Sequence, residues 1–322
     1  MSIALGLNSL TNVRFDDTQV SSVYLGTNLV WSSYAYPLDL YGSAYHAYSL
    51  RKLRSAYAGF CLRVRRPATT PTEVNVGFDS NNKISLNSPI SYASGATSAA
   101  INLGQFAAAS ASGYSNPDGI TINQSVSVVT WYDQSGNGKN VTQALTAQQP
   151  RLINAGVLET IDGSVGVRFS SVSSQLLNIA DTATPYNNAS VYVLSNSVSA
   201  LTNTSAYGLG FLSTNARMFI PSGTSISYDT SGTFPISGIS ANVDRLYELI
   251  CGASTTSAYS NGTISSVPSI ASVSSTNVYI RIGSNGSPSV YMNGHVKEVI
   301  AFVGAPNRTS IESNINSYYS VW

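Results

Sequence analysis

Short apolar runs separated by clusters of Gly, Asn, Ser and Pro extend along most of the chain. This pattern is typical of β-strands joined by tight turns. After Pro150 the runs predict strands at Val165–Phe169, Ser190–Leu194, Tyr207–Leu212, Arg217–Ile220, Ser225–Tyr228, Leu246–Cys251, Val278–Ile282 and Val296–Val303. Many short strands with frequent turns indicate a mainly β protein, either a sandwich or a barrel.

Helical spacing appears in two segments before Pro150. In the stretch 44–57 the apolar residues Tyr48, Leu50 and Leu53 recur at roughly helical intervals, which predicts a short helix. The Ala-rich segment Ser98–Ala111 predicts a second helical insertion.

The composition is unusual for its low charge. Charged residues make up 10% of the 322 positions and the net charge is +1, against roughly 25% charged residues in an average soluble protein. No long-range field therefore steers nucleic acid or an anionic membrane to the chain. Hydrophobic residues reach 43%, which excludes a disordered chain. We expect an oligomer, because compact packing would cover exposed apolar surface.

The number of cysteines and the length of the apolar runs limit the cellular compartments and partners that can be expected. The two cysteines, Cys61 and Cys251, are too few for a disulfide framework and are predicted to be separate buried thiols. The N-terminus lacks the basic and apolar regions of a signal peptide. No apolar run approaches the roughly 20 residues that span a bilayer. We therefore expect no membrane partner.

Three segments in the first half of the chain carry a family resemblance. They are VVTWYDQSGNGKNVTQALTAQQPRLI at 128–153, CLRVRR at 61–66 and VGVRFSS at 165–171. Together they resemble the opening part of the arabinofuranosidase B catalytic domain. The same opening is common among bacteriophage virion proteins that carry lectin-like sandwiches. The resemblance implies a carbohydrate-type β-sandwich.

The C-terminal third resembles the closing half of a laminin-G or concanavalin-like lectin sandwich. An Asn261-Gly262 hairpin turn and a turn over 291–294 fit that pattern, since Asn-Gly tolerates positive φ. A terminal helix follows, with a capping box predicted from Thr309 and Glu312 and an inner face formed by Ile311 and Ile315. The expected fold is a concanavalin A-like jelly-roll β-sandwich over 34–322, with a small N-terminal β element and a short C-terminal helix.

Residues 1–33 are expected to form that N-terminal element. Their last run, VYLGTNLVW at Val23–Trp31, resembles a small β-motif found near the ends of phage structural proteins. About thirty residues cannot bury enough apolar surface alone. We therefore predict a docking or oligomerisation element, the alternative being an extra edge hairpin of the sandwich.

The family resemblance can be tested for catalysis, because a retaining glycosidase needs two carboxyl groups about 5–5.5 Å apart. The family's Glu belongs between Asp181 and Asp229, where this chain has no carboxylate. The family's Asp belongs in the loop after Ile282-Gly283, where Ser284 and Asn285 stand instead. The sequence therefore predicts that the chain is not an enzyme and needs no cofactor.

Other chemistry is sparse. The remaining candidate carboxylates are Asp133, Asp229, Asp244, Glu248 and Glu298. Asp133 is expected to cap the turn after Trp131-Tyr132. Glu248 and Glu298 are expected to pair with Arg or to face solvent.

Metal sites have weak support. His46 and His295 lie far apart in sequence and lack metal-type partners. Ala144 stands where a calcium loop needs Glu, which excludes an EF-hand. A looser calcium site with Asp133 and Asn137 stays open as an alternative, but no metal is predicted.

The only dense charge is a basic cluster, which comprises Arg51, Lys52, Arg54, Arg63, Arg65 and Arg66. Nucleic-acid binding would need a net basic domain, so these residues are expected to pair with scattered carboxylates or with a neighbouring subunit.

We predict a non-catalytic virion structural protein of a tailed bacteriophage, assembled in the host cytoplasm as a capsid-decoration or fibre subunit. Its expected partners are other virion proteins through residues 1–33, copies of itself in a trimer, and a host-surface glycan. The alternatives are a glycan-binding adhesin and an arabinofuranosidase-type glycoside hydrolase. The candidate glycan-binding residues are Trp131, Tyr132, Tyr259, Asn261, Tyr291 and Asn293, because sugars stack on aromatic rings and bond to planar amides.

Overall fold

A computed structural model describes the chain over 36–67, 73–92, 98–181, 189–198, 240–251, 256–266, 278–284 and 291–322. It also gives the backbone of short strands within 14–32 and 207–235. Asp229 and Asn285 lie outside the described residues, as does the side chain of Cys251.

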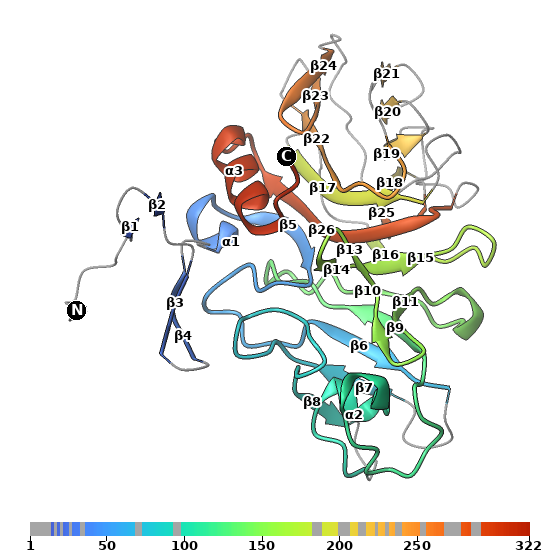
Figure 1. Ribbon diagram of the computed structural model, residues 1–322. Helices are drawn as coiled ribbons and strands as arrows, with labels where there is room; N and C mark the ends of the chain where they lie inside the picture. The colour runs from blue at the N-terminus through green and yellow to red at the C-terminus, as the bar shows by residue number, and fades with distance from the viewer. Residues whose placement is uncertain are drawn as a thin grey trace.

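The protein is built almost entirely from antiparallel strands (Figure 1). The strands that pair with one another are β5 (Ala44–Ser49), β6 (Leu62–Arg65), β7 (Glu73–Val76), β8 (Ile90–Tyr92), β9 (Val126–Trp131), β10 (Val141–Thr142), β11 (Arg151–Asn154), β12 (Val157–Leu158), β15 (Val167–Phe169), β16 (Leu177–Asp181), β17 (Ala189–Ser197), β18 (Tyr207–Phe211), β19 (Arg217–Ser222), β20 (Ser225–Tyr228), β21 (Gly232–Pro235), β22 (Arg245–Cys251), β23 (Thr256–Ser260), β24 (Thr263–Ser266), β25 (Val278–Ile282) and β26 (Gly294–Val303). A separate short hairpin joins β13 (Thr160–Ile161) to β14 (Ser164–Val165). The predicted mainly β sandwich is confirmed, and each strand predicted after Pro150 has an observed counterpart.

The long strand β26 organises the molecule. It pairs with β5 on one side and with β17 on the other, and its first residues also pair with β15. The pairing with β17 shifts register between Leu194 and Ser195, which marks an irregularity in the ladder. Lys297 lies at this irregularity.

Two hydrophobic cores lie on opposite faces of this central sheet. The main core between the layers contains Trp131, Phe169 and Val299. The second core contains Ile300, Phe302 and Tyr192 on the outer face, together with Ile311 and Ile315 of α3 (Arg308–Tyr319). Neighbouring residues of β26 such as Val299 and Ile300 enter different cores. The strand therefore has no polar face at these positions, and its sequence there is a continuous apolar run.

The helix predicted over 44–57 is wrong, because Ala44–Ser49 forms strand β5. Tyr48 and Ala47 pair with Val299 and Ile300 of β26 and are fully buried. A strand buried on both faces lacks the alternation that distinguishes it from a helix. The helical insertion predicted within 98–111 is present but short, as α2 (Leu103–Phe106) followed by a 3-10 turn.

The C-terminal helix α3 is confirmed, with Ile311 and Ile315 buried against the sheet. Its cap differs from the prediction, because the Asn307 side chain accepts the N-terminal hydrogen bond from the Ser310 backbone at 3.2 Å. The capping box of Thr309 and Glu312 is therefore wrong. Glu312 is instead bonded to Arg308 one turn earlier.

At the N-terminus, β1 (Arg14–Phe15) pairs with β2 (Thr18–Gln19), and β3 (Ser22–Leu25) pairs with β4 (Asn28–Ser32). The side chains of this region lie outside the described residues, so the role of 1–33 as a docking element stays a prediction. A one-turn helix, α1 (Pro37–Leu40), leads into β5. Within the described part of the chain, no helix has the length and apolar character needed to cross a bilayer.

Candidate functional site

Polar residues stand in register across seven neighbouring strands, and we call this set the polar row. Cross-strand partners define it in the order Glu73 (β7), Arg65 (β6), Ser127 (β9), Arg151 (β11), Arg168 (β15), His295 (β26) and Asn196 (β17). Figure 1 shows these strands following one another across the molecule. Directly paired residues project from the same face of a sheet, so the row forms one continuous polar line.

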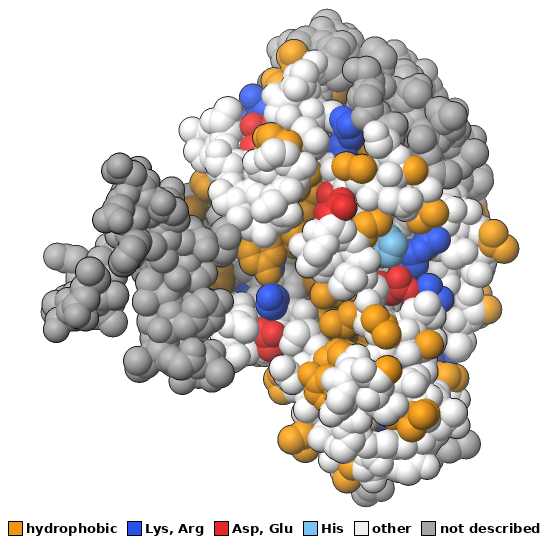
Figure 2. Space-filling view, in the orientation of Figure 1, with side chains coloured by type: hydrophobic (Ala, Val, Ile, Leu, Met, Phe, Trp, Pro, Cys, Tyr) orange, Lys and Arg blue, Asp and Glu red, His pale blue; other side chains and the backbone are white. Residues whose placement is uncertain are grey.

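The row lies on the face opposite the main core. Along β6, Leu62 and Val64 are buried in the core while Arg65 is partly exposed. Along β15, Val167 and Phe169 flank Arg168 in the same way. The alternation follows from the period of two in a strand. The core residues thereby fix which way the row points, and histidine, basic and acidic side chains gather in front of these strands in Figure 2.

Two carboxylates are shared among the cations of the row. Glu73 pairs with Arg65 and also with Arg63 at 2.6 Å. Glu159, from the segment after β12, accepts from Arg151 Nε at 2.5 Å and lies 3.4 Å from His295 Nε2. Each of these two carboxylates thus contacts two basic side chains.

His295 is held between two partners. The Asn196 amide donates to Asp244 Oδ1 at 3.0 Å, so its Oδ1 faces His295 Nδ1 at 3.2 Å as an acceptor. This arrangement places the ring hydrogen on Nδ1 and leaves Nε2 toward Glu159.

Beside the row, a buried ion pair anchors its β17 end. Lys297 is bonded to Asp244 and also donates to the Ile161 carbonyl at 2.7 Å. The Asp162 carboxylate accepts from the Asp244 backbone at 2.8 Å. Lys297 and Asp244 are almost completely buried, and such a pair is stable only with these additional hydrogen bonds.

The environment of Glu159 favours its ionised form. Burial raises the pKa of this carboxyl, but the hydrogen bonds from His295 and Arg151 outweigh burial and hold the pKa below its usual value. Glu159 is therefore a carboxylate at neutral pH, 13% exposed and able to accept hydrogen bonds from a ligand.

The six predicted glycan-binding residues lie in separate places. Asn293 borders the polar row, where its side-chain oxygen accepts from Arg168 Nη2 at 2.8 Å. Tyr291 lies two residues earlier and is partly exposed. Tyr132 is half-buried and donates its hydroxyl to Asn75 Oδ1 at 2.8 Å.

Trp131 requires a correction. Its indole is fully buried in the main core, where Nε1 donates to the Ser49 carbonyl at 3.4 Å. A ring without exposed surface offers nothing for a sugar to stack on, so Trp131 is a core residue. Tyr48 packs beside it with ring centroids 6.2 Å apart.

Tyr259 and Asn261 lie on the β23–β24 hairpin, next to α3. Asn261 and Gly262 both have positive φ, as predicted for the turn. The Tyr259 ring faces the Arg308 guanidinium, 4.0 Å from its centroid.

A buried carboxyl pair lies beneath that hairpin. Glu248 of β22 is fully buried, and Arg308 Nη1 approaches both its Oε2, at 3.8 Å, and Glu312. Within the described chain neither Glu248 oxygen nor the nearby Tyr192 hydroxyl has a hydrogen-bond partner. Burial and the neighbouring Glu312 together raise the pKa of Glu248 to about 9. The expectation that Glu248 pairs with an arginine is confirmed by its ion pair with Arg308, although the carboxyl is fully buried.

Asp133 caps its turn, as predicted. Its Oδ1 accepts from the backbones of Ala47 and Ser135 at 2.8 and 2.9 Å, and its Oδ2 accepts from the Ser135 hydroxyl and the Lys139 backbone at 2.7 and 3.1 Å. Asn137 donates to the Ala44 carbonyl. These contacts hold the loop in place. The described residues contain no group of three or more His, Cys, Asp or Glu arranged to hold a metal.

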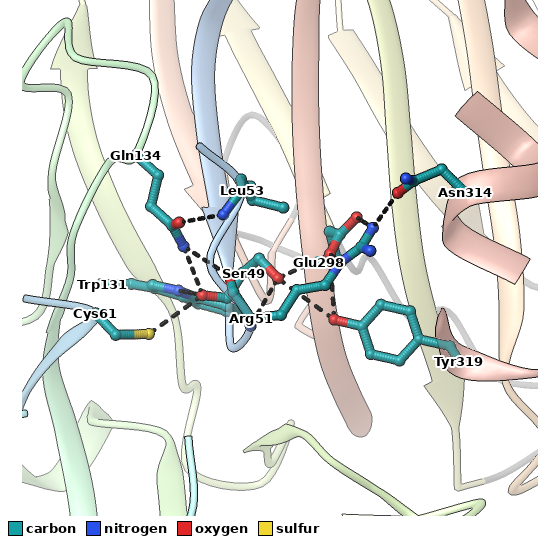
Figure 3. Close-up of polar contacts among 9 residues, drawn as sticks. All are labelled: Ser49, Arg51, Leu53, Cys61, Trp131, Gln134, Glu298, Asn314 and Tyr319. Carbon is teal, nitrogen blue, oxygen red and sulfur yellow. Dashed lines mark hydrogen bonds and ion pairs between the residues drawn. The ribbon is translucent and has the colours of Figure 1, made fainter. Parts of the chain in front are cut away.

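Glu298 pairs with an arginine, as predicted. Figure 3 shows Arg51 bonding to both oxygens of Glu298 at 2.8 Å, with the Tyr319 hydroxyl and Asn314 of α3 completing the network. Elsewhere in the basic cluster, Arg66 pairs with Asp118 at 3.0 Å. Arg51, Arg63, Arg65 and Arg66 thus each face a carboxylate, which agrees with the expected pairing.

Comparison with known proteins gives fold similarity only. No family model and no curated protein matches the chain. An arabinofuranosidase solved in complex with arabinofuranosyl-α-1,2-xylobiose superimposes with a TM-score of 0.53 at 16% identity, over 84% of this chain and 62% of that one. A mutant GH54 α-L-arabinofuranosidase soaked with 4-nitrophenyl α-L-arabinofuranoside gives 0.52 at 17% identity, over 86% and 62%. The chain thus spans about 62% of the length of these structures.

The comparisons correct one prediction and leave another without support. The prediction that the chain is not an enzyme is wrong as it stands, because these solved structures with its fold are glycoside hydrolases. At this identity the likeness shows the sandwich and assigns no catalytic residue. Carbohydrate-active β-sandwiches share the fold, whereas nothing in the comparisons points to a bacteriophage.

Proposed function

We propose that the protein binds glycans through the polar row. One observation carries the proposal: planar guanidinium, carboxylate and amide groups stand side by side on one sheet face, from Arg65 through Arg151, Arg168 and Asn293. Such groups form paired hydrogen bonds with neighbouring sugar hydroxyls. The shared fold with carbohydrate-active sandwiches supports the same reading.

The pre-organisation of these side chains supports binding as well. Arg168 donates to Gly294 O at 3.3 Å and to Asn293, and Arg151 is held by Glu159. Side chains already fixed in the free protein lose little entropy when a ligand binds. Arg151 is nevertheless 38% exposed, so its guanidinium remains accessible.

A glycan array probed with the full chain tests the proposal. Binding should fall at least about tenfold in the Arg151→Ala variant, since a charge-assisted hydrogen bond contributes about 1.5–3 kcal/mol. The Lys83→Ala variant removes an exposed cation outside the row and should bind like the parent. Binding that survives at full strength in Arg151→Ala, or the absence of any bound glycan, would overturn the proposal.

A second candidate function is glycoside hydrolysis, favoured by the buried pair Glu248 and Glu312. Burial and the adjacent Glu312 raise the pKa of Glu248, while Glu312 is bonded to Arg308. A neutral acid beside a carboxylate is the combination that glycosidases use. Substrate would have to displace Arg308, which is 25% exposed above the pair. Turnover of an aryl arabinofuranoside, abolished in both Glu248→Gln and Glu312→Gln, would support this function, and its absence in the parent would refute it.

We also propose that the protein stands on the surface of a bacteriophage particle as a trimer attached through residues 1–33. The sequence resemblances and the low-charge composition support this setting. Mass spectrometry of purified particles should detect the chain, and native mass spectrometry of the isolated protein should give three copies. A monomer absent from particles would contradict it.

A further inference from the structure

We infer that the polar row selects acidic glycans, with a sugar carboxylate bound between Arg151 and Arg168. The inference rests on the proposed glycan binding and names the class of ligand. Its starting point is the pairing of two cations directly opposite one another on β11 and β15.

Like charges at directly opposed positions destabilise an antiparallel sheet. Glu159 relieves only part of this repulsion, because it is bonded to Arg151 and also faces His295. Among the described residues, no carboxylate forms an ion pair with Arg168, whose guanidinium bonds to Gly294 O and Asn293 Oδ1. These neutral acceptors orient the guanidinium without balancing its charge.

The imbalance extends along the row. Arg65 of the row and its strand neighbour Arg63 share Glu73, Arg151 pairs with Glu159, and Arg168 has no ion-pair partner among the described residues. The whole chain carries a net charge of only +1, so this positive excess is local. A local excess of fixed cations on a nearly neutral protein attracts an anion to that place.

The surroundings of Arg168 disfavour its charged form. Burial lowers the pKa of Arg168, the neighbouring Arg151 lowers it as well, and Glu159 opposes them without restoring the usual value. A ligand carboxylate would favour the charged guanidinium and remove this penalty.

Geometry favours a carboxylate over a hydroxyl. Neighbouring strands lie about 4.8 Å apart, so two opposed guanidinium groups can meet the two oxygens of one carboxylate. The planar donor fork of arginine matches that group in paired hydrogen bonds. Asn293 and Glu159, on either side, are placed to accept from or donate to neighbouring sugar hydroxyls.

The test uses carboxylated oligosaccharides paired with the same oligosaccharides after reduction of each carboxylate to an alcohol. Titration calorimetry with the full chain should show the acidic member binding at least tenfold more tightly, and the preference should weaken as salt is added. Arg168→Gln should abolish the preference, Arg168→Lys should retain part of it, and Lys83→Ala should leave it unchanged. Thermal melting of each variant establishes that it is folded.

The outcomes separate the two proposals. If acidic and reduced glycans bind equally, the preference for acidic sugars is refuted while glycan binding stands. If no glycan binds, the proposed function itself fails. If Arg168→Gln is folded and keeps the full preference, the carboxylate is bound elsewhere and the assignment to Arg151 and Arg168 is overturned.

Discussion

Arg151 and Arg168 face one another across two antiparallel strands, and Glu159 is the one carboxylate close to either within the part of the chain that the structure describes. Strand pairs of this kind are normally avoided, because like charges directly opposite destabilise a sheet. The pair lies on the face away from the main core, where we propose that a ligand anion offsets the repulsion.

Replacing Arg168 should therefore leave the fold nearly as stable as before. In Arg168→Gln, relief of the repulsion offsets the two lost hydrogen bonds, so the free energy of unfolding should change by less than about 1 kcal/mol. Urea denaturation of the ligand-free protein measures it. A loss above about 2 kcal/mol would show instead that Arg168 holds the structure together.

The buried pair of Arg51 and Glu298 should behave in the opposite way. Arg51→Met leaves the Glu298 carboxylate buried without its cation, which should cost about 3–5 kcal/mol of unfolding free energy. Replacing both residues by apolar ones should cost less than the single change. The matched control is Arg63→Met, whose side chain is 41% exposed and whose loss should cost less than about 1 kcal/mol. Equal effects of Arg51→Met and Arg63→Met would contradict this view of the network.

Glu248 should make the protein less stable as the pH rises. Its folded pKa of about 9 lies above the unfolded value of about 4.3, so between these values the folded chain binds the extra proton. Stability from this group is complete below the lower value and falls by up to about 1.4 kcal/mol per pH unit toward the higher one. Glu248→Gln should flatten this decrease in denaturation curves recorded from about pH 5 to pH 9. Parallel curves for parent and variant would show that Glu248 ionises normally.

Asp133 should be more important to stability than other turn aspartates. Asp133→Ala leaves the buried Ala47 and Ser135 backbone donors unsatisfied, at about 1–3 kcal/mol each. Asp79 accepts from Asn81 and Lys83 in a more exposed turn, so Asp79→Ala should cost only about 1 kcal/mol. Thermal or urea denaturation of both variants checks the order, and a reversed order would contradict it.

The strands were predictable because turn residues delimit them and their apolar runs are short. The strand at Ala44–Ser49 was not, since burial on both faces removes the alternation that periodicity detects. Local signals also identified the turn role of Asp133 and the Asn261-Gly262 hairpin. In both cases the residues that form the turn lie within a few positions of one another in the sequence.

The polar row could not be predicted from the sequence, for a different reason. Arg65, Arg168 and His295 are widely separated along the chain, and only the register of long-range strand pairing brings them into line. The alternation of Arg168 between Val167 and Phe169, like that of Arg65 beside Val64, was a local signal, since it marks an outward charge on a core strand. The burial of Glu248 depends on the packing of α3 over β22. No local sequence pattern predicts that packing.

On β6 and β15 the outward residues Arg65 and Arg168 alternate with neighbours that are committed to the interior. Along these strands, alternate residues therefore serve two different purposes: the outward ones serve recognition and the inward ones serve folding. Outward residues can therefore be substituted one strand at a time. Such substitutions change the bound target and keep the core side chains on which folding depends.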